Sequence, residues 1–414
     1  MEIARKSDRR IFAGNMALMV SVFVLTTAEW HLYSWYQAVA PYGTVISSIG
    51  LAVALLCYVD VKEMLKDPAF LLMCAADIIA LVNLFLVGSG KGAFLTAADF
   101  LLILYLSNKI ELSNKQVIIT MCYVGSFFIY WTVDVKGYFK GYNTNYGGLI
   151  LISGFFFAVY ALEYLRYYLV KIKGMKKAGW LILLSLFFFA WGYNIIAWYR
   201  SRCALLGLIA FAVLMIIPLK VWKNKAFYYI VTLATTAGAV LFSLLYVWLG
   251  VMKDTFRIQI FYKDIISGRE EIWSELWTAF ILQPVTGIGS SYEMKLDWLG
   301  GMFEVHNGLL DILIVHGVPV FAVTLVFIVK RFMELRDSAV SGALNKCAMA
   351  GVFSMMMPAF MENYIIVPPF SIILLLLMAV VRHRAFEDTA ICISSENRTD
   401  TEEMSGVKQQ ENNA

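Results

Sequence analysis

Long apolar stretches follow one another along most of the chain and predict membrane-spanning helices. A helix needs roughly 20 mostly apolar residues to cross the hydrocarbon core of a bilayer. Stretches of this kind occupy residues 11–29, 40–59, 68–88, 92–107, 116–133, 147–165, 178–198, 203–220, 227–250, 308–329, 344–361 and 365–381. The pattern predicts an all-α integral membrane protein of about twelve transmembrane helices. We expect such a multi-pass protein to lie in the cytoplasmic membrane.

Basic residues alternate between the two sides of these predicted spans. Lys and Arg cluster before the first span and in every second connection, at residues 62–66, 109–115, 166–177, 220–225 and 330–346. Because such clusters stay in the cytoplasm, both termini are expected there. This topology divides the chain into spans one to nine (1–250), one large, partly helical external loop (251–307), spans ten to twelve (308–384) and a polar, disordered cytoplasmic tail (385–414).

Composition narrows the class of function. The chain is 60% hydrophobic and only 15% charged, with a formal net charge of +4. No dense basic stripe with interleaved aromatic residues occurs, so no nucleic-acid partner is expected. The 6 Cys are scattered, and neither a metalloprotease HExxH motif nor a phosphate-binding GxxxxGK[ST] loop is present, so no metal and no cofactor are predicted.

The large loop contains a predicted amphipathic helix. Ser267 and Glu270 have the spacing of a capping box, and Pro284 is expected to end the helix. Six apolar residues share one of its faces: Ile272, Trp273, Leu276, Trp277, Phe280 and Ile281. Spacing alone leaves open whether this is a membrane-surface helix without chemistry or one on which Arg269, beside unpaired N-terminal amides, binds phosphate.

Further candidate site residues lie at the external ends of predicted spans. Arg200 and Arg202 break the rule that basic residues stay inside, and either snorkel to headgroups or converge with Arg269 on an anion. His306 and Asn307 stand at the mouth of the tenth span, as a polar cap or with the histidine as a proton acceptor. Asp77, Asp99 and Asp311 in or near spans, and Glu362 at the end of the eleventh, are the remaining candidates.

Three segments, in this order, resemble the family of O-antigen ligases and Wzy-type O-antigen or capsule polymerases. They are RSRCALLGL (200–208), SGREEIWSELWTAFILQPVTGIG (267–289) and HNGLLDILIVHGVPV (306–320), with NTNYGGLI (143–150) as a weaker fourth. The chain departs from the family pattern at Val315, where an acidic residue often stands, which leaves open whether Asp311 or Glu362 serves instead.

The resemblance implies a bacterial glycosyltransferase whose site faces outward. It implies that Arg202 and Arg269 engage the pyrophosphate of an undecaprenyl-linked saccharide and that His306 acts on the acceptor hydroxyl or the phosphate, with no metal required. Arg200, Asn307, Trp273 and Glu362 are the further residues predicted to bind substrate. Membrane lipids, a flippase and a chain-length regulator are the partners that such an enzyme has.

Two further classes of function stay open beside the favoured one. Polymerisation of lipid-linked repeat units comes first, and ligation of a finished glycan to another acceptor is the alternative within the family. A polysaccharide-lipid flippase or ion-coupled transporter explains the spans but not the long loop with its Trp and Arg residues. A purely structural membrane protein would explain the fewest of these sequence features.

Overall fold

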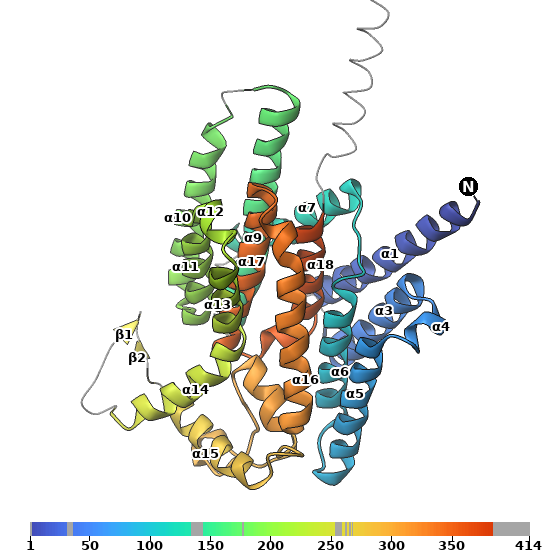
Figure 1. Cartoon of the computed structure of the whole chain (residues 1–414). Coiled ribbons are helices and arrows are strands. Elements are labelled where there is room, and N and C mark those ends of the chain that lie inside the picture. The colour runs from blue at the N-terminus through green and yellow to red at the C-terminus, as the bar shows by residue number, and fades with distance from the viewer. Residues whose placement is uncertain are drawn as a thin grey trace, which may run out of the picture.

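The computed structural model of the chain is a bundle of helices (Figure 1). It describes residues 2–30, 36–133, 144–175, 178–252, 259–260, 263–264, 266 and 268–383. The predicted tail at 385–414, and Asn143 and Ser267 of the motifs above, lie outside these residues.

Every predicted apolar segment overlaps a helix or a pair of helices. The first half contains α1 (Glu2–Trp30), α2 (Tyr36–Val39), η1 (Ala40–Tyr42), α3 (Gly43–Tyr58), α4 (Val61–Met64), α5 (Pro68–Leu86), α6 (Lys91–Leu106), α7 (Asn114–Val133), α9 (Thr144–Tyr167), the π-turn η2 (Tyr168–Ile172) and α10 (Trp180–Tyr199). The second half contains α11 (Arg202–Ile216), α12 (Leu219–Trp222), α13 (Lys225–Thr235), α14 (Ala237–Gly250), β1 (Gln259–Ile260), β2 (Lys263–Asp264), α15 (Arg269–Leu282), η3 (Asp297–Leu299), α16 (Gly308–Ala339), α17 (Ala343–Met356), η4 (Pro358–Phe360), η5 (Tyr364–Ile366) and α18 (Phe370–Arg382).

Helix length and hydropathy support membrane insertion but do not establish the count of about twelve spans. Among the described residues, 5 helices are long and apolar enough to cross a membrane, or 6 if α13 and α14, bent by 54°, form one span. Three shorter apolar helices are α3, α11 and α18. The protein is thus an all-α membrane protein with several apolar helices, apart from the small antiparallel pair β1 and β2, and its exact span count stays a prediction.

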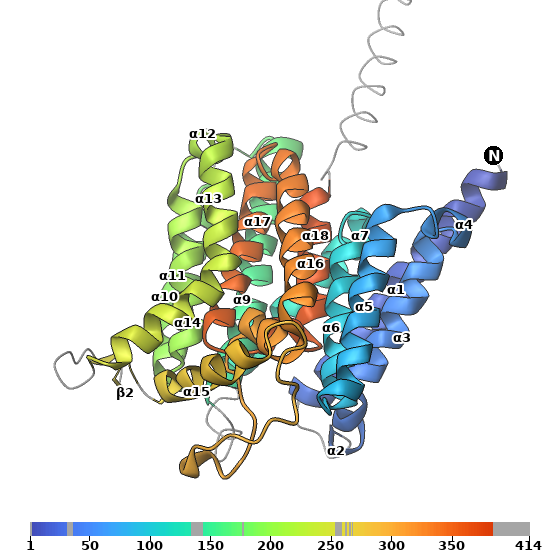
Figure 2. The ribbon, with the colours of Figure 1, turned by 60° about the horizontal axis from the view of Figure 1, so that its bottom comes forward.

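Helices α16, α17 and α18 lie in the middle of the bundle (Figures 1 and 2). The N-terminal helices α1 to α6 flank them on one side, and α9 to α14 flank them on the other (Figure 1). Helix α18 is buried almost throughout, from Phe370 to Val381. A helix that is hydrophobic on all sides belongs in the interior, so the C-terminal spans form the core against which both flanks pack.

One end of the bundle gathers basic residues that the sequence assigned to the cytoplasm. The Lys346 ammonium donates to the carbonyls of Met215 and Ile217 at the end of α11. The Arg331 guanidinium donates to the Leu104 carbonyl near the end of α6. Cations are favourable at helix C-termini because the last carbonyls lack partners there. We call this the basic end. That it faces the cytoplasm stays a prediction. Labelling with a membrane-impermeant thiol reagent, at cysteines introduced at Lys173 and Glu293, tests it.

The opposite end carries α15 and the segment after it, and we call it the loop end. Here α16 is interrupted at Gly317, whose φ of 81° lies in the left-handed region. The segment after α15 docks into the interruption. The Val318 amide donates to the Pro284 carbonyl, and the Ile288 amide donates to the Ile314 carbonyl. Gly287 and Gly289, at the end of the second sequence motif, and Gly317 of the third motif thus help to fix the large loop onto the tenth predicted span.

We expect Gly317→Ala to destabilise the protein by about 3 kcal/mol, because it combines backbone strain with overpacking. A Cβ at Gly317 would lie 2.1 Å from the Val285 carbonyl oxygen, and the chain has a positive φ there. The matched control is Gly179→Ala, because a Cβ at Gly179 meets no atom within 4 Å. Thermal unfolding in detergent measures both. Equal melting temperatures for the two variants would contradict the docking of the loop into α16.

Candidate functional site

Helix α15 places Arg269 at its first residue. Gly268 precedes it with a φ of 93°, and the backbone amide of Gly268 donates to the Glu270 carboxylate at 2.8 Å. The predicted capping box gave the capping role to Ser267, which lies outside the described residues. Helix α15 ends at Leu282, shortly before Pro284. The predicted end of this helix is therefore confirmed, whereas its start lies one residue later than the capping box placed it, because the N-cap is Gly268 and not Ser267.

The apolar face of α15 is the predicted one, with one exception. Ile272, Trp273, Leu276 and Phe280 are buried, whereas Ile281 is 70% exposed. The Trp273 indole donates to the Val305 carbonyl at 2.6 Å, and its ring packs edge-on against Tyr246. Trp273 was predicted to bind substrate. Its side chain is fully buried and holds α15 in place, and its contact with substrate stays a prediction.

Asn307 is the N-cap of α16, which gives it a structural role, and its predicted contact with substrate stays a prediction. Its side-chain oxygen accepts from the Leu310 amide at 3.0 Å. Its side-chain nitrogen donates to the carbonyls of Ala239 and Phe360. The residue has no exposed surface. Asn307 thus fixes the start of α16 and with it the position of His306, the residue before it.

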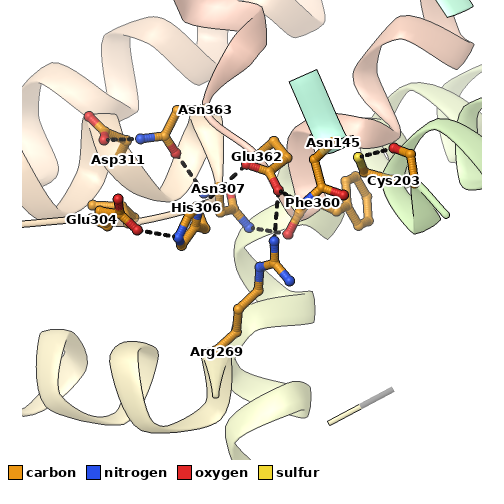
Figure 3. A network of polar contacts seen from close by, with 12 residues as sticks. Asn145, Cys203, Arg269, Glu304, His306, Asn307, Asp311, Phe360, Glu362 and Asn363 are labelled. Atoms are coloured by element: carbon orange, nitrogen blue, oxygen red, sulfur yellow. Dashed lines mark hydrogen bonds and ion pairs between the residues drawn. The ribbon is translucent and has the colours of Figure 1, made fainter. Parts of the chain in front are cut away.

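A single carboxylate, that of Glu362, joins the candidate residues of three distant segments (Figure 3). Glu362 lies between η4 and η5. Its Oε1 accepts from Nη2 of Arg269 at 2.7 Å and from Nδ2 of Asn145 at 2.8 Å. Its Oε2 lies 3.3 Å from Nδ1 of His306. Together with Glu304 these residues form a group that we call the Glu362 cluster.

His306 lies between two carboxylates of unequal exposure. Its Nε2 lies 2.5 Å from Oε2 of Glu304, whose side chain is 42% exposed, whereas that of Glu362 is 12% exposed. Its backbone has a φ of 53°, a left-handed conformation that directs the ring between them. An imidazole held on Nδ1 by a buried acid is fixed in orientation. The Nε2 side, next to the exposed and less constrained Glu304, is the one that an entering ligand can reach.

The two arginines near α11, which were predicted to be external, occupy the same end of the bundle as this cluster. Arg200 is exposed and left-handed at the end of α10. Nη1 of Arg202 donates to the carbonyl of Asp264, on the strand β2 that precedes α15. Cys203, the next residue, lies within electrostatic range of Glu362 and Arg269. The common anion site for Arg202 and Arg269 stays a prediction.

Three polar residues of the site were not singled out from the sequence. Glu304 lies two positions before His306, and this spacing was its only signal. Asn145 lies within the weakest of the four motifs. The side-chain nitrogen of Asn363 donates to the Asp311 carboxylate at 2.8 Å, and its side-chain oxygen accepts from the backbone amide of Asn307 at 2.7 Å. Of the two carboxylates left open, Glu362 therefore contacts Arg269 and His306, whereas Asp311 helps to brace the start of α16.

The described residues contain no group of three or more His, Cys, Asp or Glu side chains placed to hold a metal ion. The arrangement instead offers a guanidinium and an imidazole on either side of one buried carboxylate. A guanidinium binds phosphate oxygens in a bidentate fashion, and an imidazole exchanges a proton near neutral pH.

Comparison with known proteins agrees with this reading of the loop end. A family model described as O-antigen ligase matches residues 184–325. This range contains Arg200, Arg202, Arg269 and His306, and with them the three main motifs of the sequence. No curated protein and no solved structure matches the chain. Residues 184–325 thus match the O-antigen ligase family, and this match supports the resemblance to O-antigen ligases and Wzy-type polymerases that the sequence motifs indicated.

Proposed function

We propose that this protein polymerises lipid-linked polysaccharide repeat units on the external face of the bacterial cytoplasmic membrane. The match to the O-antigen ligase family implies glycosyl transfer on a lipid-linked sugar. The observation that carries the proposal is the Glu362 cluster, in which Arg269 and His306 meet across one carboxylate. The donor in this proposal is a saccharide on undecaprenyl pyrophosphate, and the acceptor is a hydroxyl group of the next repeat unit.

Arg269 has unused capacity to bind the donor pyrophosphate. Its Nη2 is paired with Glu362, but its Nε is buried and has no hydrogen-bond partner among the described residues. A buried donor without a partner is costly, so an anion that supplies an acceptor gains affinity there. The first amides of α15 also lie beside this side chain and favour negative charge. Both features support a phosphate at this point.

The transfer then needs charge neutralisation and one proton acceptor. The bond between the anomeric carbon and the pyrophosphate oxygen breaks, and undecaprenyl pyrophosphate leaves with the electron pair. Arg269 offsets the charge that develops on the leaving group. The acceptor oxygen bonds to the anomeric carbon, and its proton passes to Nε2 of His306. Glu362 holds Nδ1 meanwhile and stabilises the imidazolium. Glu304 must first move away from Nε2, which its exposure permits.

Ligation of a finished glycan to another acceptor is the second candidate, because the matching family is described as O-antigen ligase. Both reactions share the donor and the leaving group and differ only in the acceptor, so the Glu362 cluster serves either.

Incubation of the purified protein with undecaprenyl-pyrophosphate repeat units tests the proposal. We expect a ladder of longer lipid-linked glycans on a gel, with release of undecaprenyl pyrophosphate. Transfer to lipid A-core or to a protein, with no ladder, would favour the ligase. Movement of the lipid across vesicle membranes with no new glycosidic bond would contradict both candidates and favour a flippase.

A further inference from the structure

A cavity of about 900 Å³ lies along one side of α15. Five polar residues of α15 line it: Glu270, Glu271, Ser274, Glu275 and Thr278. Residues three and four apart share one helix face, so these side chains form a continuous polar stripe. We call the cavity the α15 groove. The groove begins at Glu270, the residue that follows Arg269 in the chain.

The rim of the α15 groove is apolar. Leu86 ends α5, Val251 follows α14, and Leu282 ends α15. Val251 is 84% exposed and Leu282 is 80% exposed. Helix α5 is a candidate membrane span, and α14 belongs to the bent pair that counts as one. Exposed apolar residues at the ends of spans lie at the edge of the lipid. The groove therefore combines the polar stripe of α15 with an otherwise largely apolar lining, and its apolar entrance suits a lipid chain.

The charges inside the groove select against phosphate. Among the described residues, three carboxylates and one basic residue, Lys295, line it. A pyrophosphate there would be repelled, whereas the hydroxyl groups of a sugar donate well to carboxylates. The two hydrogen bonds that Glu275 accepts, from the Tyr292 hydroxyl and the Lys295 amide, both go to Oε1. Burial raises the pKa of Tyr292, and its hydrogen bond to Glu275 raises it further, so the phenol stays protonated as a donor.

The simplest alternative is that the carboxylates are structural. Glu270 and Glu271 lie in the first turn of α15, where negative charge is favourable. Glu271 also accepts from the Trp298 indole. These roles explain why acids stand at the start of the helix. They do not explain why the polar stripe continues to Ser274 and Thr278 along an open cavity that begins beside Arg269.

We propose that the α15 groove binds the acceptor as a hydroxyl-rich saccharide without acidic groups, whose lipid leaves through the apolar rim. The proposal rests on the proposed function and adds where the acceptor lies. Donor pyrophosphate and acceptor sugar then occupy opposite sides of the start of α15. Because Arg269 is positive and the polar stripe is acidic, the donor pyrophosphate is favoured at Arg269 and disfavoured in the α15 groove.

Ser274→Trp tests this inference, because Ser274 is exposed on the groove side of α15 and an indole there fills the cavity. We expect the KM for the acceptor to rise at least tenfold while the affinity for the donor is unchanged. The matched control is Ile281→Trp, since Ile281 is exposed on the same helix but does not line the groove. An unchanged acceptor KM in Ser274→Trp would refute the inference. An equal loss of donor affinity would assign the groove to the donor.

A second measurement does not depend on catalysis. The thiol of Ser274→Cys is expected to react several times more slowly with a thiol reagent when the free oligosaccharide repeat unit is present, and mass spectrometry reads the site. Lack of protection overturns the acceptor groove even if the wild-type protein polymerises. Protection without any transfer by the wild-type protein would instead contradict the proposed function and leave a saccharide-binding groove.

Discussion

Arg269→Ala is expected to lower glycosyl transfer by about 100-fold or more and to weaken donor binding as well, because removal of one preorganised donor to a developing anion typically costs this much. Arg269 pairs with Glu362 through Nη2 at 2.7 Å and keeps Nε without a partner among the described residues. Arg269→Lys should restore only part of the activity, since Lys lacks the bidentate geometry of the guanidinium. The measurement compares donor affinity with initial rate for purified proteins.

Loss of folding is the main confounding effect in this experiment. The side chains of Arg269 and Glu362 are both 12% exposed, and removal of one partner from a buried pair costs about 3–5 kcal/mol. The double variant Arg269→Ala/Glu362→Gln removes the uncompensated charge and should recover much of the thermal stability but not the donor affinity. Donor binding at the wild-type level in this double variant would exclude Arg269 as the phosphate ligand.

His306→Ala is the second variant with a large expected effect. Transfer should fall by about 100-fold or more, since general-base catalysis contributes roughly 10²–10⁴-fold. Donor affinity should stay close to that of the wild type, because Arg269 and Glu362 keep their contact. This separation of rate from affinity distinguishes His306 from Arg269. Near-normal polymer from the variant would remove the base assignment and leave His306 as a polar cap at the start of α16.

The backbone at His306 calls for a second substitution as the control. With a φ of 53°, alanine is strained there, whereas asparagine tolerates the left-handed region. His306→Asn should therefore be more stable than His306→Ala and equally deficient in transfer. If the transfer activity of the two variants instead follows their thermal stability, His306 acts by supporting the local backbone conformation and not by accepting a proton.

Apolar stretches and short local signals for helix starts and ends predicted the helices that carry the site residues. The apolar stretches overlap the observed helices because burial in lipid or in the bundle requires a continuous hydrophobic surface. Helix α15 begins at Arg269 and ends before Pro284 because helix starts and stops depend on a few neighbouring residues. The motifs around Arg202, Arg269 and His306 identified the family, and the family model covers all three.

The burial of individual side chains was harder to predict. Trp273 and Asn307 were predicted to bind substrate. Both are fully buried. Ile281 was assigned to the buried face and is exposed, because no described residue covers this side of the last turn of α15, although Phe280 in the same turn is buried. A periodic pattern gives the direction of a side chain but not what packs against it.

What the sequence by itself determined is the class of protein, its helices and two of the residues that carry the proposed chemistry, Arg269 and His306. Only the tertiary structure decided that Glu362 joins them. Glu362 is 56 positions from His306, 93 from Arg269 and 217 from Asn145, and no local rule relates residues so far apart. Their meeting depends on the docking of the segment after α15 into the interrupted α16 and on the cap that Asn307 provides. Packing of distant segments, and not residue type, placed one carboxylate between the arginine and the histidine.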